Sequence, residues 1–305
     1  MNNFLLSMII CLDNSSLDFE FYEKTLREFA NSFGYHLQID GEPFQYKYFE
    51  KILDLCERLN IKDIGIRVNE KIDESQIELI RKYNIRSVMF RYDSIYVEEN
   101  TNLTKRCNFP TEISLIIDKK NIYEIDKIIK WAIKKHINLI VLERGIIAKY
   151  RKKSIDVLSK DQYRYIMEKV VKHNHEHRNI GIALSHCPNK ILLHKDRQSD
   201  FKTGGCSAGI ISCAIDINGN IIPCLPLYNV VEGNIKNDSL LQVWDNSETF
   251  NKLRNRGLLK GKCGKCIYKN LCGGCRAESL YKKNDLLDED DTCWNENVRG
   301  WGMWT

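Results

Sequence analysis

Eight of the twelve cysteines lie in the last third of the chain, between residues 206 and 293. They form a spread set and then a compact one: Cys206-x6-Cys213-x10-Cys224, Cys263-x2-Cys266-x5-Cys272-x2-Cys275, and finally Cys293. In a reducing compartment, such a group indicates metal or iron–sulfur ligation rather than disulfides. Eight thiolates suffice for two four-cysteine sites, which either two zinc ions or two [4Fe–4S] clusters would fill.

The elements that must position these cysteines begin with a regular alternation of strands and helices. Amphipathic helical patterns separate the apolar runs, and one such helix is expected over 121–136 with Ile133 on its buried face. Such alternation predicts βαβ units and a parallel sheet. Seven apolar runs are the expected strands: 4–12, 35–39, 63–68, 86–92, 112–118, 138–143 and, more weakly, 180–185.

The predicted fold class is α/β, with a partial (β/α)6 barrel whose reactive face lies at the C-terminal ends of the strands. An open doubly wound sheet is the competing architecture. After about residue 200 the pattern changes to a hairpin over 213–224 with an Asn-Gly turn, and then one helix over 239–256. We therefore expect a barrel over 1–200 and a small cysteine-rich domain over 201–305, ending in an aromatic tail.

Composition excludes several classes of protein. With 305 residues, 43% of them hydrophobic and 29% charged, the chain is ordinary for a globular protein. The net charge of +5 is spread along the sequence, which predicts solvated faces and no nucleic-acid footprint. No apolar run is long enough for a membrane span, and the N-terminus lacks the basic flank of a signal peptide. A cytoplasmic protein without membrane contact is expected.

Residues 206–293 resemble the SPASM domain, the C-terminal extension of many radical S-adenosylmethionine (AdoMet) enzymes that modify peptides and proteins. That family has G-x4-C, then C-x2-C-x5-C-x3-C, then a last cysteine. Here Gly219-x4-Cys224 and Cys263-x2-Cys266-x5-Cys272 match, while the interval between Cys272 and Cys275 is one residue shorter than usual.

The resemblance implies two auxiliary [4Fe–4S] clusters with crossed ligand sets, and it favours them over zinc. The first cluster would take Cys206, Cys213, Cys224 and Cys275. The second would take Cys263, Cys266, Cys272 and Cys293. This assignment uses every cysteine of the region and leaves no iron open to substrate.

The first half of the chain resembles a radical-AdoMet barrel. Gly41, Glu42 and Pro43 follow the second predicted strand and resemble the family's GGEP motif, with Asp40 in place of the first glycine. In the family this loop recognises the amino group of AdoMet, so the three residues are the candidate remnant of an AdoMet loop.

The chemistry of that family also needs C-x3-C-x2-C just after the first strand, and no such motif occurs in the chain. Three thiolates there bind three irons, and the fourth iron binds AdoMet. If Cys11 is placed on the first ligand, Ser15 and Asp18 fall on the other two. Hydroxyl and carboxylate groups are poor substitutes for thiolates at iron–sulfur sites. The barrel is therefore expected to be degenerate, without AdoMet cleavage.

Three functions follow from these observations. The first is a non-catalytic partner of a radical-AdoMet enzyme in the maturation of a ribosomally made peptide, which binds the peptide or the enzyme or relays electrons. The alternative is an active maturase with an atypical cluster at Cys11. An enzyme with chemistry unrelated to radicals ranks last, because the sequence offers no convincing acid–base or nucleophilic group of residues for it.

Overall fold

The computed structural model describes residues 4–151, 156–176, 180–185 and 205–295. Two of the sequence predictions lie outside these residues. They are the domain boundary at 200/201 and the aromatic tail after residue 295.

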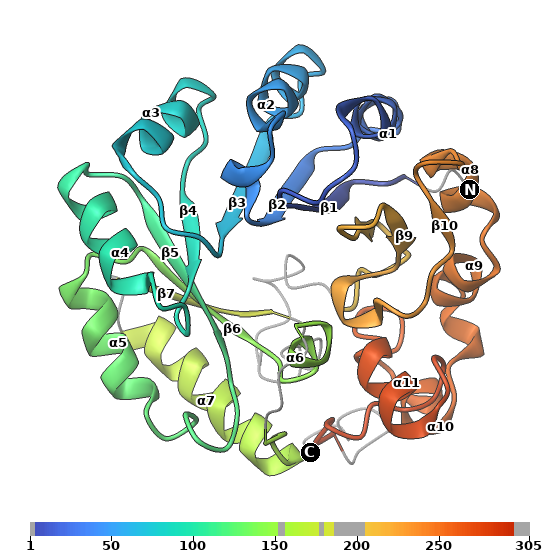
Figure 1. The fold of residues 1–305 in the computed structure, drawn as a ribbon. Coiled ribbons are helices and arrows are strands. Elements are labelled where there is room, and N and C mark those ends of the chain that lie inside the picture. The colour runs from blue at the N-terminus through green and yellow to red at the C-terminus, as the bar shows by residue number, and fades with distance from the viewer. Residues whose placement is uncertain (1–3, 152–155, 177–179, 186–204, 296–305) are drawn as a thin grey trace.

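Seven parallel strands form a curved wall, and the longer helices between them lie on its outer side (Figure 1). Each strand pairs with the next one in the chain, so the order follows the sequence. The predicted partial barrel is confirmed, and all seven expected runs are strands. Their bounds are β1 Ser7–Leu12, β2 His36–Gly41, β3 Asp63–Val68, β4 Val88–Arg91, β5 Thr111–Ile116, β6 Leu139–Glu143 and β7 Gly181–Ser185.

The helices of the barrel bury one apolar face each against the strands. They are α1 Phe19–Asn31, α2 Phe49–Arg58, α3 Glu74–Lys82, α4 Val97–Arg106, α5 Ile125–Lys134 and α7 Lys160–Glu176. Ile128 and Ala132 of α5 are buried, but Ile133 is half exposed, against expectation. Successive helical residues differ by about 100° in direction, so Ile133 turns away from the face that holds Ala132. A short extra helix, α6 (Ile147–Tyr150), follows β6.

The cysteine-rich segment extends the sheet of the barrel. Strand β8 (Ser212–Ile215) pairs in parallel with β1, β9 (Asn220–Ile222) pairs antiparallel with β8, and β10 (Gly233–Asn234) completes the edge. The predicted hairpin is confirmed, since Gly219 adopts the positive φ of 82° that its turn requires. One sheet of ten strands therefore joins the barrel to the segment that carries the cysteines.

The helices of this segment lie at two places along the barrel: the first packs against α1, and the last lies near Ile146, which follows β6. They are α8 Leu240–Asn246, α9 Glu248–Arg254, α10 Gly261–Lys265 and α11 Arg276–Lys283. The sequence predicts one helix over 239–256, but two are present. The break comes at Ser247, whose hydroxyl accepts a hydrogen bond from the amide of Phe250 and so caps a new helix.

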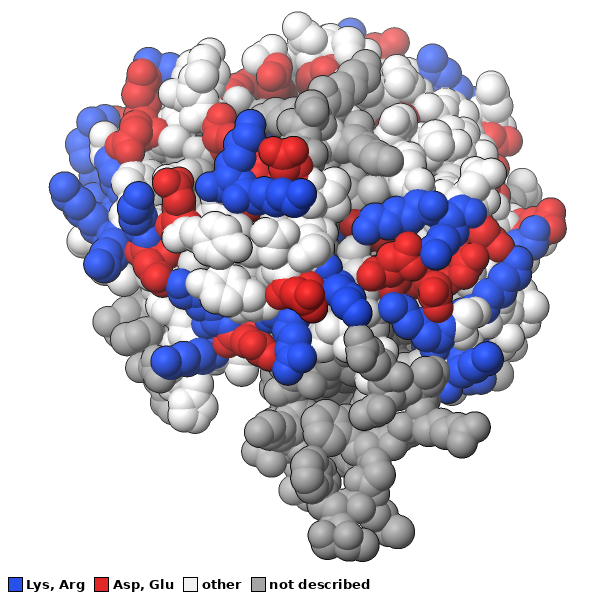
Figure 2. Space-filling model, turned by 90° about the horizontal axis from the view of Figure 1, so that it is seen from below, with Lys and Arg blue, Asp and Glu red and all other residues white. Residues whose placement is uncertain are grey.

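Charged side chains of both signs are interspersed on the face of the molecule that Figure 2 shows. This agrees with the spread charge of the sequence. In the described part of the chain, every helix is too short or too polar to cross a bilayer.

Candidate metal centre

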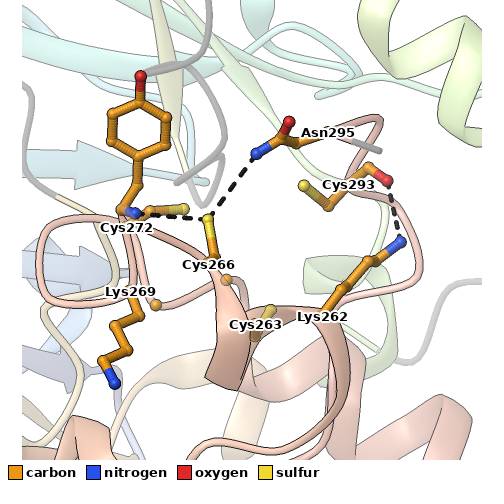
Figure 3. A pocket seen from close by; sticks show the side chains of 10 residues that line it. Lys262, Cys263, Cys266, Lys269, Cys272, Cys293 and Asn295 are labelled. Carbon is orange, nitrogen blue, oxygen red and sulfur yellow. Dashed lines mark hydrogen bonds between the residues drawn. The ribbon is translucent and has the colours of Figure 1, made fainter. Parts of the chain in front are cut away.

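Four cysteines line one pocket beside helix α10, and they are the four that the sequence assigns to the second cluster (Figure 3). Cys263 lies within α10, Cys266 ends that helix, and Cys272 and Cys293 approach from two loops. Lys262, Lys269 and Asn295 lie at the same pocket. Segments separated by about 30 residues thus place all four thiols around a common space.

Two of these sulfurs already accept N–H hydrogen bonds. Cys266 Sγ accepts from the amide of Tyr268 at 3.4 Å and from the side-chain amide of Asn295 at 3.8 Å. Cys263 Sγ accepts from the amide of Asp290 at 3.4 Å. Hydrogen bonds to ligand sulfurs stabilise the thiolate form and influence the reduction potential of a bound cluster.

Two thiols of the second set disfavour ionisation unless a cation joins them. Burial raises the pKa of Cys272 to about 12, and negative charge on Cys293 acts in the same direction. Burial likewise raises the pKa of Cys293 to about 11. Because ligands must lose their protons, metal or cluster binding supplies the positive charge that lets these neighbouring thiolates coexist.

Three cysteines of the first predicted set lie near one another. Burial raises the pKa of Cys224 well above its ordinary value, and the charges of Cys206 and Cys275 raise it further. Cys224 precedes the short 3-10 helix η3 (Leu225–Leu227), and Cys275 caps α11. The first site thus draws on the hairpin, on the loop before it and on the start of the last helix.

The structure does not bring Cys213, the fourth predicted ligand of this set, to the other three. Cys213 is buried in the main hydrophobic core with Trp244, Phe250 and Leu253. Its neighbour Ala214 points to the opposite side of β8 and packs near Leu225. Side chains alternate along a strand, so the position of Cys213 in β8 directs its thiol toward the outer helices. Three cysteines therefore remain for the first site.

Two glycines between Cys272 and Cys275 let charged groups approach the cysteine loop. Gly273 and Gly274 both have positive φ, at 67° and 66°. A side chain on Gly273 would collide with the guanidinium of Arg256, and one on Gly274 with that of Arg276. The CGGC stretch is thus a backbone shaped to hold two buried arginines against the cysteines.

These arginines test whether an iron–sulfur cluster fits the sites. Arg256 Nη1 and Arg276 Nε are buried and have no hydrogen-bond acceptor among the residues that the structure describes. Leaving a buried charged donor unpaired is costly. A [4Fe–4S] cluster has inorganic sulfides as well as cysteine sulfurs that accept such hydrogen bonds. A zinc site has only the sulfurs of its cysteine ligands as acceptors. The donors present suit the cluster.

In the described ranges, no group of three or more His, Cys, Asp or Glu side chains is arranged to hold a single metal ion. Four cysteines nevertheless border one pocket.

A second pocket lies at the C-terminal ends of the barrel strands, where the candidate AdoMet loop is found. Gly41 and Glu42 line it, and Pro43 is buried behind them at the start of the 3-10 helix η1 (Pro43–Gln45). Gly41 has φ 111°, and a Cβ there would lie 2.5 Å from the carbonyl oxygen of Leu12. The backbone turn of the loop is therefore one that glycine alone adopts without strain.

The three positions aligned with the missing cluster motif point in different directions. Cys11 Sγ lies 3.2 Å from the hydroxyl of Tyr150. The amide and hydroxyl of Ser15 both donate to Asp13 Oδ1, at 2.7 Å. Asp18 lies 3.1 Å from Lys47 Nζ in an exposed ion pair. A hydrogen-bonded turn thus stands where the family has its cluster.

A buried charge network that the sequence reasoning missed fills the barrel beside this pocket. Arg67 Nη1 lies 3.0 Å from Asp40 Oδ2 and 3.1 Å from Glu143 Oε1. The other oxygen of Glu143 lies 2.8 Å from Arg151 Nη1. The network could have been predicted from one signal in the sequence. Charged residues stand at or beside the ends of apolar predicted strands, at Asp40, Arg67 and Glu143, and a charge in such a place is expected to be buried and paired.

Comparisons with known proteins identify the C-terminal segment. Residues 206–276 match the SPASM family, an iron–sulfur cluster-binding domain. The chain is 28% identical over 205 residues to AdoMet-dependent heme synthase of Methanosarcina barkeri. This alignment covers 62% of this chain and 57% of the relative. It is 30% identical over 80 residues to PqqA peptide cyclase of Bradyrhizobium diazoefficiens, or 25% of this chain and 21% of the relative. The chain thus spans less than two thirds of either relative.

Solved structures share the fold along nearly the whole chain. Streptococcus suis SuiB bound to its precursor peptide SuiA superposes with a TM-score of 0.74 at 20% identity, over 96% of this chain and 76% of SuiB. SuiB has also been solved bound to S-adenosylmethionine. The predicted resemblance is confirmed at the level of the domain and the fold: residues 206–276 match the iron–sulfur cluster-binding SPASM family, and the chain shares the fold of SuiB.

Proposed function

We propose that this protein binds two [4Fe–4S] clusters and serves as a non-catalytic partner of a radical-AdoMet enzyme in peptide modification. It would bind the precursor peptide or the enzyme, or relay electrons. The observation that carries the proposal is the contrast between its two ends. Two groups of cysteines are gathered in the C-terminal segment, while the initiating C-x3-C-x2-C motif is absent from the sequence.

The environment of Cys11 supports the lack of radical initiation. Burial and the nearby Asp40 carboxylate raise the pKa of Cys11, and its thiol pairs with Tyr150. One thiol cannot supply the three thiolates that an initiating cluster needs, and Ser15 and Asp18 stand at the other two positions. Without an initiating cluster, no electron reaches the sulfonium of AdoMet. The barrel then serves binding rather than catalysis.

The names of related proteins support the class of partner. The name of PqqA peptide cyclase indicates a peptide substrate, and SuiB was solved with its precursor peptide. A longer curated match is to an AdoMet-dependent heme synthase, so a modified tetrapyrrole is the second class to test. Both classes of molecule are acted on by a catalytic partner in this proposal, not by this chain.

Formation of 5′-deoxyadenosine tests the proposal. Protein purified and reconstituted without oxygen would be incubated with AdoMet and dithionite, beside a radical-AdoMet enzyme that has the complete motif. We expect no 5′-deoxyadenosine above the protein-free background, and co-purification with a maturase or precursor peptide encoded near it. Product that scales with the protein and disappears in Cys11→Ala would instead establish the active maturase. Failure to bind any maturase, peptide or porphyrin would remove the partner role.

A further inference from the structure

Arg256 lies where the two cysteine sites meet. The amide of Cys206, from the first site, donates to the carbonyl of Cys272, from the second, at 3.0 Å. Arg256 opens the 3-10 helix η4 (Arg256–Leu258) and is 9% exposed. Its Nη2 donates to the carbonyl of Cys206 at 2.7 Å, and its guanidinium rests on the backbone of Gly273. One side chain therefore touches the loops of both sites.

The charge of Arg256 acts on thiolates of both sets. Burial lowers the pKa of Arg256, and the thiolates of Cys206, Cys272 and Cys263 act to raise it again. Cys206 belongs to the first set and the other two belong to the second. Arginine keeps its charge even when buried, so this cation persists between the sites.

The neighbouring arginines are engaged elsewhere. Arg144 forms a buried ion pair with Asp290 at 3.2 Å, which offsets its charge. Arg276 Nη1 donates to the carbonyls of Leu286 and Asp288, and its Nη2 approaches Cys263 Sγ of the second site at 3.8 Å. None of the ion pairs between described residues includes Arg256, and its Nη1 has no acceptor among them.

We propose that Arg256 is a shared electrostatic contact that raises the reduction potentials of both clusters and so keeps them within reach of the same electron. The inference rests on the proposed function, since it requires two clusters. Each one-electron reduction adds a negative charge in a buried site, and a fixed cation there stabilises the reduced form. An electron then passes from one reduced cluster to the other, oxidised one, with no bond made or broken.

The test is an EPR-monitored redox titration of the full chain, with iron and sulfide counted on every sample. Arg256→Gln removes the charge but keeps an amide donor for the carbonyl of Cys206. We expect both midpoint potentials to fall by about 59 mV. For a one-electron couple, this is about a tenfold change in the ratio of reduced to oxidised cluster at a fixed potential. Arg254→Gln is the matched control, because Arg254 donates to the carbonyl of Trp244 on the outer helices.

The outcomes separate this inference from the proposed function. A wild-type protein without two clusters would overturn both. Two intact clusters of which one or neither shifts in Arg256→Gln would overturn the shared role of Arg256 alone. If Arg256→Gln does not retain iron, Arg256→Lys becomes the test. Its ammonium keeps the charge, so both midpoint potentials should stay close to those of the wild type. A fall of about 59 mV in either potential would contradict the electrostatic role.

Discussion

The direction of one thiol decides how many cysteines the first site has. Because Cys213 lies in the hydrophobic core, Cys213→Ala should retain about eight irons per chain and lose only packing free energy, about 1 kcal/mol. Cys224→Ala removes a thiol of the site and should lose about four irons. Iron and sulfide analysis of both variants checks this. Loss of about four irons in Cys213→Ala would restore the four-cysteine set that the resemblance implies.

A second prediction at this scale concerns Cys56, which lies away from both sites. Burial raises the pKa of Cys56 to about 12 in the folded protein, against an ordinary value of 9.0. The unfolded chain therefore releases this proton first as the pH rises. The stabilisation is complete below pH 9 and is lost as the pH rises toward 12, by up to about 1.4 kcal/mol per pH unit.

Urea unfolding of the wild type and Cys56→Ala at about pH 8 and about pH 11 measures this effect. The difference in unfolding free energy between the two proteins should shrink at the higher pH, since only the wild type has the thiol. A constant difference across that range would mean that the folded protein does not hold Cys56 neutral.

Residue type predicted the candidate ligands, and geometry supplied what spacing could not. Cysteine is rare enough that eight of them in one segment indicate ligation directly. The side of β8 on which Cys213 lies depends on strand register, which a cysteine pattern does not contain. The role of Arg256 could not be predicted for a different reason. Arg256 precedes the compact cysteine motif in the sequence, and only the fold brings its guanidinium to Gly273.

At the scale of elements, the loop after β2 depends on a backbone turn at Gly41. Gly41→Ala should destabilise the protein by about 1–3 kcal/mol, because φ 111° is strained for alanine and its Cβ would meet the carbonyl of Leu12. Gly65→Ala is the control in the next strand, where the new Cβ meets the flexible end of Gln38. Equal urea midpoints for the two variants would show that this turn is not constrained as described.

Hydrophobic periodicity predicted the strands well and the short helices poorly. All seven strands of the barrel were predicted from apolar runs. Parallel strands that are buried on both faces give near-continuous apolar sequence, which is easy to recognise. The break at Ser247 depends on one capping hydrogen bond, and α6 spans four residues, too few for any period. Both features come from local contacts rather than from a repeated pattern.

For the whole molecule, a buried ion pair joins the barrel to the cysteine segment. Arg144 follows β6 and pairs with Asp290, whose carboxylate also accepts the amide of Cys275 at 2.9 Å. Arg144→Met leaves that carboxylate buried and unpaired, and should cost about 3–5 kcal/mol of stability and weaken iron retention. Arg164→Met breaks the exposed pair with Glu168 and should cost less than about 1 kcal/mol.

Urea unfolding and iron analysis of these variants, with the double variant Arg144→Met/Asp290→Asn, complete the test. The double variant should recover part of the loss, since it removes the buried charge as well. An Arg144→Met protein as stable as Arg164→Met would show that the pair does not hold the two segments together. The sequence could not reveal this pair, because its members lie 146 residues apart.

The joining of the two segments into one sheet was also beyond the sequence. Pairing of β8 with β1 brings together strands about 200 residues apart, and neither strand encodes its partner. One sheet therefore runs through both predicted domains.

The measurement that tests the account most directly is the content of iron, acid-labile sulfide and zinc in protein purified without oxygen. We expect about eight irons and eight sulfides per chain, as two [4Fe–4S] clusters require. About twelve irons would contradict the account, because a third cluster would then exist despite the dispersed Cys11, Ser15 and Asp18. Two zinc ions without iron would reduce the cysteine segment to a structural module.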